Sequence, residues 1–475
     1  MNQILFQYQQ VAPTTWVYLS SLLMIGLFFK FNRFWSVRNL DLLLLILLAP
    51  GLLLVQHGEG DQMRAKILQR TSPVNEAIAT PPTPENPPAP PPQVVEVAQQ
   101  ISEAGQAIER MGYIWLFSVG GLFLLRMLLD PTMVRRPLLE PNLSLGGMLF
   151  LGCSLFVFLM ANVMVSVPTE DDLKGPRSAA QLLNRETSEE KNNDLRRHGP
   201  GYAVLHLVPA IPTISMIHSR PPREMNAIYA IIAKVMAVIS QLMIVIGMVA
   251  IGYQHFDNLR MGIGAATLYL MLPYSAEMTG RVDHVLPAAL LVWAVSCYRR
   301  PLLTGIFMGL AMGTVYYPLF LLPLWLSFYW QRGVIRFTIG VLSALAVLAF
   351  SLVFVSHSPA DYWSHLRAMF GLWWPVTSGL SGIWNLGWDP VYRLPVLAAF
   401  VALSGSFVVW PAQKNLGTLL SCSSAVMIAT QFWHGHGGGE FMAWYLPLAL
   451  LTIFRPNLED RVAVAVLGEG WRMRR

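Results

Sequence analysis

Thirteen apolar segments, separated by short polar or charged stretches, dominate this chain of 475 residues. They lie near 15–30, 40–55, 113–129, 145–166, 227–253, 261–275, 284–298, 301–315, 317–331, 337–355, 392–410, 416–433 and 441–455. A helix needs about 20 apolar residues to cross the hydrocarbon core of a bilayer, so the shorter segments leave the number of spans at about 11–13. Lipid offers the backbone no hydrogen-bond partner, so a crossing segment must pair its own peptide groups. The sequence therefore predicts an all-α, polytopic transmembrane helix bundle with external loops.

The low content of charged residues excludes a large water-soluble domain. Charged residues make up 13% of the chain and hydrophobic residues 54%, whereas soluble domains carry about 25% charged residues. The net charge of +6 comes from Lys and Arg at the ends of apolar segments, so we expect membrane lipids and no nucleic acid as partners. Cys153, Cys297 and Cys422 lie inside apolar segments, which favours neither a disulfide framework nor a thiolate metal site.

The basic residues that flank the apolar segments fall on one side of the predicted membrane. They are Lys30, Arg33, Arg38, Arg126, Arg135, Arg136, Arg260, Arg299, Arg300, Arg332, Arg336, Lys414, Arg455, Arg472, Arg474 and Arg475. Because cytoplasmic loops carry the excess of Lys and Arg, this side is expected to be the cytoplasm. The N-terminus is then outside and the C-terminus cytoplasmic, in a multi-pass protein of the cell membrane, most simply the inner membrane of a bacterium.

Three parts follow from this map. Residues 1–144 form a three-span N-terminal extension with an external loop at 56–112, residues 145–455 form the transmembrane core, and residues 456–475 form a basic cytoplasmic tail. The loop of the extension contains PPTPENPPAPPP (81–92), which favours an extended polyproline II conformation. We expect this loop to be a spacer without a catalytic part.

The core has two long external loops, at 167–226 and 356–391. The first contains eight basic and eight acidic residues and is expected outside, because long loops translocate largely regardless of charge. It runs through a polar helical stretch and closes on HGPGYAVLHLVPAIPT (198–213), whose prolines favour a segment lying on the membrane surface. The second loop is rich in tryptophan: Trp363, Trp373, Trp374, Trp384 and Trp388. These rings form either an interfacial belt or a platform for a sugar ring or an isoprenoid tail, with Trp373 and Trp374 as the candidates for the platform.

Acidic residues on the external side collect at two span ends. Asp171 and Asp172 follow the segment 145–166, and the short turn GRVDH carries Arg281, Asp283 and His284. A carboxylate at the mouth of a helical bundle is partly desolvated, which raises its pKa and favours general-base chemistry. The alternatives are a helix N-cap for Asp171 or Asp172 and an ion pair with Arg281 for Asp283.

Other chemical motifs are weak or absent. The sequence HGHGGGE (434–440) offers His434, His436 and Glu440 as weak metal candidates, and a flexible external turn is the alternative. The chain contains no P-loop, no nucleotide-binding glycine fingerprint after a strand, no HExxH and no GxSxG. Nucleotide-driven pumping by this chain alone is therefore not expected.

Four features in order carry a family resemblance. An acidic EDD (170–172) follows a span, then come HGPGYAVLH (198–206), RVDH (281–284) and the small-residue helix RRPLLTGIFMGLAMGTVYYPLFLLPL (299–324). Together they resemble the GT-C superfamily of membrane glycosyltransferases, particularly the protein mannosyltransferase and aminoarabinose-transferase branch and the polyprenol-phosphate-mannose-dependent mannosyltransferases. The first branch has Asp-Glu, His-Pro-Pro and a Lys before the proline. This chain has Asp-Asp, Gly-Pro-Gly and Tyr316-Tyr317 at those places.

The resemblance implies a GT-C-like core and a glycosyltransferase that uses a polyprenyl-phosphate-linked sugar. Asp171 or Asp172 would take the proton from the hydroxyl of an acceptor glycan, lipid or protein. Outward-facing positive groups would stabilise the departing lipid phosphate: Arg220, Arg223, Arg281 and His284. No cofactor is required, and a divalent metal between the acids and the phosphate is compatible with the superfamily.

Two other functions fit a polytopic bundle. A transporter or lipid flippase typically carries ionisable residues at mid-membrane and helices broken in matched halves, whereas the spans here are nearly free of acids. A noncatalytic membrane scaffold would use the Pro-rich loop to engage a partner. Transfer of sugar from a lipid-linked donor distinguishes an enzyme from both.

Overall fold

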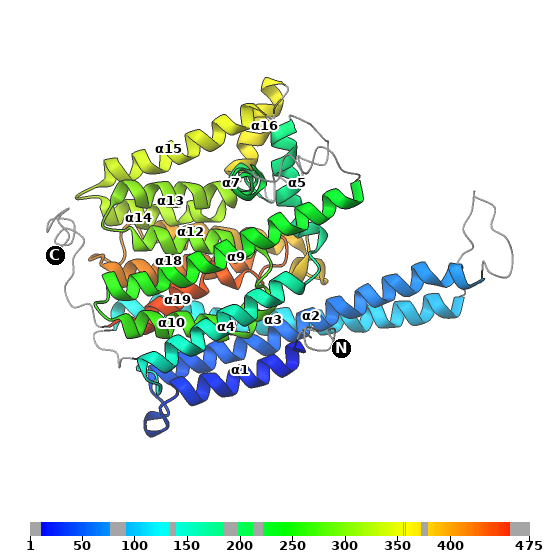
Figure 1. The fold of residues 1–475 in the computed structure, drawn as a ribbon, viewed down its shortest axis with the longest axis horizontal. Helices are drawn as coiled ribbons and strands as arrows, with labels where there is room; N and C mark the ends of the chain where they lie inside the picture. The colour runs from blue at the N-terminus through cyan, green and yellow to red at the C-terminus, as the bar shows by residue number, and fades with distance from the viewer. Residues whose placement is uncertain are drawn as a thin grey trace, which may run out of the picture.

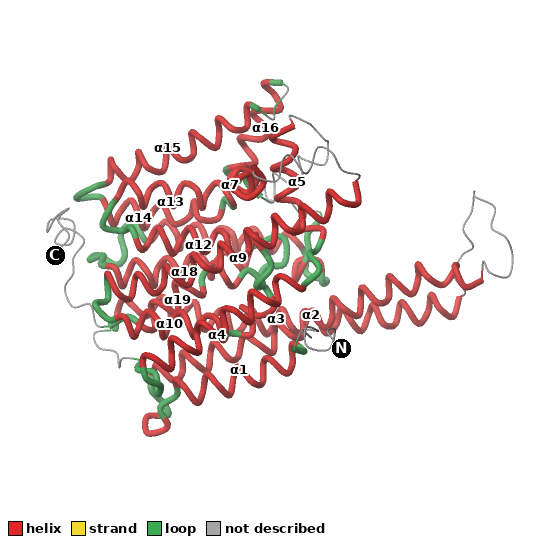
Figure 2. Tube along the Cα trace, in the orientation of Figure 1, coloured by secondary structure: helices red, strands yellow, loops and turns green. Residues whose placement is uncertain are grey.

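The computed structural model describes residues 11–76, 92–133, 139–184, 198–211, 222–354, 356, 358–371 and 379–456. Within these ranges the chain forms 17 α-helices joined by turns and short 3-10 helices, and no strand occurs there (Figure 2). Each predicted apolar segment overlaps a helix that runs along the bundle. The predicted all-α, polytopic architecture is confirmed.

The helices that run along the bundle lie side by side (Figure 1). In the N-terminal unit they are α1 (Pro13–Phe28), α2 (Val37–Glu76) and α3 (Pro92–Leu129). In the rest of the chain they are α4 (Leu145–Val165), α9 (Pro222–Gln254), α10 (Leu259–Met271), α12 (Val282–Ser296), α13 (Pro301–Thr314), α14 (Leu322–Tyr329), α15 (Val334–Val353), α17 (Arg393–Ser406), α18 (Leu416–Trp433) and α19 (Leu446–Phe454). Among the described residues, six helices are long and apolar enough to cross a membrane, and six more apolar helices have 10–17 residues.

The two ends of the bundle differ in charge. The connections 29–36, 297–300, 330–333 and 407–415 meet at one end, on the left of Figure 1, with the end of α19. They carry most of the basic flanking residues that the structure describes: Lys30, Arg33, Arg299, Arg300, Arg332, Lys414 and Arg455. The opposite end carries the shorter helices α5 (Glu170–Asn184), α7 (Pro200–Ala210) and α16 (Pro359–Met369). The short helix α11 (Pro273–Glu277) joins α10 to α12. We call this opposite end the acidic end, because α5 opens with Glu170, Asp171 and Asp172.

Most of the stretch 56–112, predicted as an external loop, is helical. α2 continues to Glu76 and α3 begins at Pro92, and the two form an antiparallel hairpin that projects beyond the acidic end (Figure 1). The helices approach closely because glycines face each other: a Cβ on Gly58 would lie 2.5 Å from the Gly105 carbonyl oxygen. Such close contact stabilises helices that lack the hydropathy of a span. The polyproline II prediction for 81–92 lies outside the described residues, apart from Pro92, which begins α3.

The first external loop of the core forms the predicted polar helix, α5, and then the short helix α7. α7 is viewed nearly end-on in Figure 1, so it runs across the bundle helices and not along them. Gly199 N–H donates a hydrogen bond to the Thr314 carbonyl oxygen (2.9 Å), and a Cβ on Gly201 would lie 2.7 Å from the Gly313 carbonyl carbon. The glycines of HGPGY therefore let the start of α7 rest directly on the end of α13.

Candidate functional site

The first acid of the site, Asp172, lies in the first turn of α5. Its Oδ2 accepts hydrogen bonds from the Thr169 backbone N–H (2.9 Å) and hydroxyl (2.7 Å). Neither Asp171 nor Asp172 is the N-cap residue, because α5 begins at Glu170 and Thr169 precedes it. Asp172 is the third helical residue, and its bond from the Thr169 N–H is one half of a capping box. Its other oxygen, Oδ1, lies 3.3 Å from Arg281 Nε, and the side chain is 8% exposed. Asp172 thus both caps α5 and contacts the turn before α12.

Its neighbour Asp171 is placed differently. Successive residues of an α-helix point about 100° apart, so only one of the two can face the bundle. The Asp171 side chain is 32% exposed and forms an ion pair with Lys174 (2.7 Å). Of the two predicted general bases, the geometry favours Asp172.

The second acid, Asp283, belongs to the first turn of α12 and is buried. Its carboxylate lies 3.5 Å from Arg281 Nε, 3.8 Å from His198 Nε2 and 3.9 Å from His284 Nε2. The ion pair with Arg281 that the sequence suggested is therefore present. These separations exceed the usual N–H···O range of about 2.7–3.2 Å, so the contacts are mainly electrostatic. Neither carboxylate oxygen has a geometrically defined hydrogen bond among the described residues.

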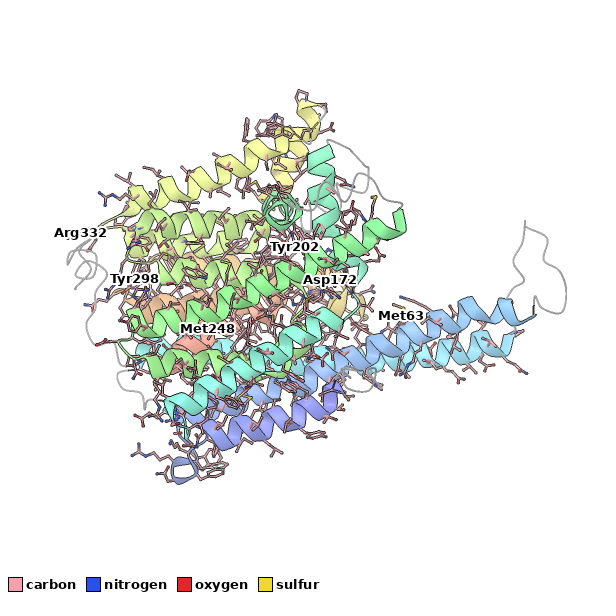
Figure 3. The ribbon with its side chains drawn as sticks, viewed as in Figure 1. Met63, Asp172, Tyr202, Met248, Tyr298 and Arg332 are labelled. Carbon is pink, nitrogen blue, oxygen red and sulfur yellow. The ribbon has the colours of Figure 1, made fainter. Side chains whose placement is uncertain are left out.

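The two histidines beside Asp283 are held by aromatic neighbours. His284 Nδ1 lies 2.7 Å from the Tyr274 hydroxyl, and its ring stacks on Phe441 with centroids 4.3 Å apart. His198 stacks on Tyr202, with centroids 4.4 Å apart. Figure 3 shows Tyr202 and Asp172 near the same end of the bundle, with Arg332 at the other.

His198 was not singled out from the sequence as a site residue. Its signal was its place at the start of HGPGYAVLH, a segment interpreted as surface-lying and as one feature of the family resemblance, with no role given to the histidine. The contact with Asp283 arises because Gly199 and Gly201 fix the start of α7 on the end of α13. Because His198 and Asp283 are far apart in the chain, no local sequence pattern reveals their contact.

Several predicted site residues fall outside what the structure describes. Arg220, Trp373 and Trp374 lie in undescribed segments, and Arg223 belongs to α9 but its side chain is not described. Their assignment stays a prediction. Two other tryptophans of the same loop, Trp363 and Trp388, are exposed, while Trp384 is buried.

The metal candidates do not converge. The His434 ring is buried against Phe441, 6.4 Å from the His436 ring between centroids. Glu440 turns toward α3, where its Oε1 accepts a hydrogen bond from the Tyr113 hydroxyl (2.9 Å). Throughout the part of the chain that the structure describes, no group of three or more His, Cys, Asp or Glu side chains is arranged to hold a metal ion. The segment is a turn, as the alternative had it, but most of it is buried.

Burial shifts the proton affinity of two carboxyls at this end. It raises the pKa of Asp172, against the lowering effects of Arg281 and of the hydrogen bonds from Thr169. It also raises the pKa of Glu440 to about 8, with a further contribution from Glu59. These are carboxyls whose protonation can change nearer to neutral pH than usual, which is typical of general acid or base groups.

Comparisons with protein-family models, with curated proteins and with solved structures find no match to this chain. The class of the protein therefore follows from its fold and its site alone. It is a polytopic helical membrane protein. At one end of its bundle, Asp172, Arg281, Asp283, His198 and His284 are brought together from three separate segments of the chain.

Proposed function

We propose that this protein is a membrane glycosyltransferase that moves a sugar from a polyprenyl-phosphate donor to an acceptor on the external or periplasmic face. The observation that supports the proposal most is the convergence of Asp172 and Asp283 on Arg281. These residues come from the first turn of α5 and the start of α12, the two span ends at which the GT-C resemblance expects its acidic and basic groups.

The proposed reaction is a displacement at the anomeric carbon. The acceptor oxygen forms the new bond to that carbon, its proton passes to the Asp172 carboxylate, and the bond to the phosphate oxygen breaks. Polyprenyl phosphate leaves with the electron pair, and Arg281 stabilises its charge. The Arg281 side chain is 25% exposed whereas that of Asp283 is 5% exposed, so the guanidinium is the more accessible partner of this pair.

The surface beside Asp172 suits a lipid-linked donor. The end of α4 and the residues after it expose Met164 (57%), Val165 (53%) and Val167 (90%) a few positions before the acid. An isoprenoid tail lying against this apolar surface would bring its phosphate to the acidic end of the bundle. A nucleotide sugar has no tail to use such a surface.

Purified protein in detergent, incubated with radiolabelled sugars on polyprenyl phosphate and an extract of envelope acceptors, tests this function. We expect transfer from at least one lipid-linked donor and none from the matching nucleotide sugars. Transfer from nucleotide sugars alone, or from neither class, would contradict the proposal.

The orientation is part of the same proposal. The positive-inside rule would place the basic end of the bundle in the cytoplasm and the acidic end outside. Glu170 is exposed, with an 81% accessible side chain, so a cysteine at this position is a suitable probe. We expect a membrane-impermeant maleimide to label it on intact cells lacking an outer membrane barrier. Labelling only after lysis would invert the orientation.

Replacing Arg281 should move the pH dependence of transfer. Asp172 acts as a base only when ionised, and Arg281 lowers its pKa against the effect of burial. Arg281→Gln removes the positive charge that lowers the pKa of Asp172, so this pKa rises further. The acid limb of the kcat/KM profile should therefore shift to higher pH, beyond any change in maximal rate. Arg177→Gln, which removes an exposed partner of Glu170 at 3.6 Å, is the matched control and should leave the limb in place. A limb that stays, or moves to lower pH, in Arg281→Gln would show that Asp172 is not the titrating base.

A further inference from the structure

The turn 434–445, between α18 and α19, contacts the candidate site on one of its sides. The Phe441 ring stacks on His284, with centroids 4.3 Å apart. Trp444 Nε1 donates a hydrogen bond to the Asp283 carbonyl oxygen (3.2 Å). The turn therefore supports both the histidine and the aspartate at the start of α12.

On its other side the same turn is attached to α3 of the N-terminal unit. Tyr113 is 1% exposed, and its hydroxyl donates the hydrogen bond to Glu440 Oε1. The next turn of α3 lies close to Gly439, where a Cβ would stand 3.3 Å from the Phe117 ring. Gly439 has φ of 102°, a conformation that favours glycine, so the chain can turn here against the helix.

These contacts form a continuous path from the N-terminal unit to the site. It runs from Tyr113 through Glu440 to the adjacent Phe441, and from its ring to His284. The Tyr274 hydroxyl holds His284 at Nδ1, and Nε2 is the ring nitrogen on the side of Asp283. Because His284 is fixed between Tyr274 and Phe441, a displacement of the turn changes the position of the imidazole relative to Asp283.

We infer that Tyr113 and Glu440 are positioning residues of the site, and that α3 of the N-terminal unit sets the positions of Asp283 and His284 through the turn 434–445. The catalytic consequence rests on the proposed function, whereas the positioning itself does not. The N-terminal unit, which precedes all four sequence features that carry the resemblance, thereby becomes a part of the site.

Three variants test the path. Tyr113→Phe removes the donated hydrogen bond, Glu440→Ala removes its acceptor, and Glu440→Gln keeps an oxygen that can accept it. The matched control is Tyr329→Phe, which removes another buried tyrosine hydroxyl, one that donates to the Tyr298 carbonyl oxygen. Tyr298 lies near the opposite end of the bundle (Figure 3).

The first readout is hydrogen–deuterium exchange, which needs no activity. We expect faster exchange in peptides covering 434–445 and 282–288 for Tyr113→Phe and Glu440→Ala, and near wild-type exchange for Glu440→Gln. Tyr329→Phe should leave both peptides unchanged. Unchanged exchange in both peptides for Tyr113→Phe and Glu440→Ala would overturn the inference, whatever the activity of the protein.

The second readout is sugar transfer. If the wild-type protein transfers sugar, Tyr113→Phe and Glu440→Ala should lower kcat about 10- to 100-fold with KM nearly unchanged, as expected for a misplaced site, and Glu440→Gln should restore most of the rate. A wild-type kcat in Tyr113→Phe would overturn the inference. Absence of transfer by the wild type would count against the proposed function alone, and hydrogen exchange would still decide the inference.

Discussion

Replacement of Asp172 by asparagine is expected to lower sugar transfer at least about 100-fold, the usual scale for loss of a general base. Asparagine has nearly the same shape but cannot accept the acceptor's proton. It keeps an oxygen for the Thr169 hydrogen bonds that cap α5. The fold should therefore remain, and the effect should appear in kcat measured with saturating lipid-linked donor.

Asp171→Asn is the matched control for this experiment. Asp171 lies on the same helix turn but pairs with Lys174 on a more exposed face. Its replacement should change kcat by no more than about twofold, because exposed ion pairs contribute little. Equal losses in both variants, or wild-type rates in both, would contradict the assignment of the base.

The second large effect is expected from a buried ion network at the basic end of the bundle. Asp130 is fully buried and contacts Arg126 Nη1 (2.9 Å) and Arg455 Nη2 (2.7 Å). Arg126 also binds Asp41 through Nε (2.7 Å). Two carboxylates thus balance two guanidinium groups. Asp130→Asn leaves a buried positive charge without its partner, so the free energy of unfolding should fall by about 3–5 kcal/mol.

Unfolding in mixed micelles at increasing dodecyl sulfate measures this loss. Asp61→Asn provides the control, because Asp61 pairs with the exposed side chain of Arg64 (3.4 Å) and its loss should change stability by less than about 1 kcal/mol. A similar small change for Asp130→Asn would show that the network does not hold α3 to the end of α19.

Most of the fold could be predicted because lipid imposes a simple rule. A segment that crosses a bilayer must be apolar and helical, so hydropathy alone located every helix that runs along the bundle. The same rule did not predict the helices within 56–112. This polar sequence has no hydropathy signal, and its helices depend on close contact between α2 and α3 at Gly58 and Gly105, a contact between residues far apart in the chain.

The residues of the candidate site could be predicted from the sequence where they are ionisable groups at the ends of apolar segments. Asp172, Arg281, Asp283 and His284 stood out as ionisable groups at span ends, and the structure brings them together. The choice between Asp171 and Asp172 was not accessible, because it depends on the rotation of α5 about its axis.

The interpretation of Glu440 as a metal candidate failed because its hydrogen-bond partner lies far away in the chain. Its sequence neighbours His434 and His436 suggested a metal site, but its hydrogen-bond partner, Tyr113, is 327 positions away in the chain. Local spacing cannot reveal a partner on another helix. His198 was missed for the same reason, because its contact with Asp283 depends on how α7 rests on α13.

Photocrosslinking with the donor's lipid tests most directly whether these segments form one substrate site. A polyprenyl phosphate with a diazirine beside its phosphate would be irradiated with the purified protein, and the labelled peptides would be identified by mass spectrometry. We predict labelling of peptides that cover 170–177 and 278–288, with competition by unlabelled polyprenyl phosphate. Labelling confined to the opposite end, at 297–300 or 407–415, or labelling that does not compete, would contradict the account.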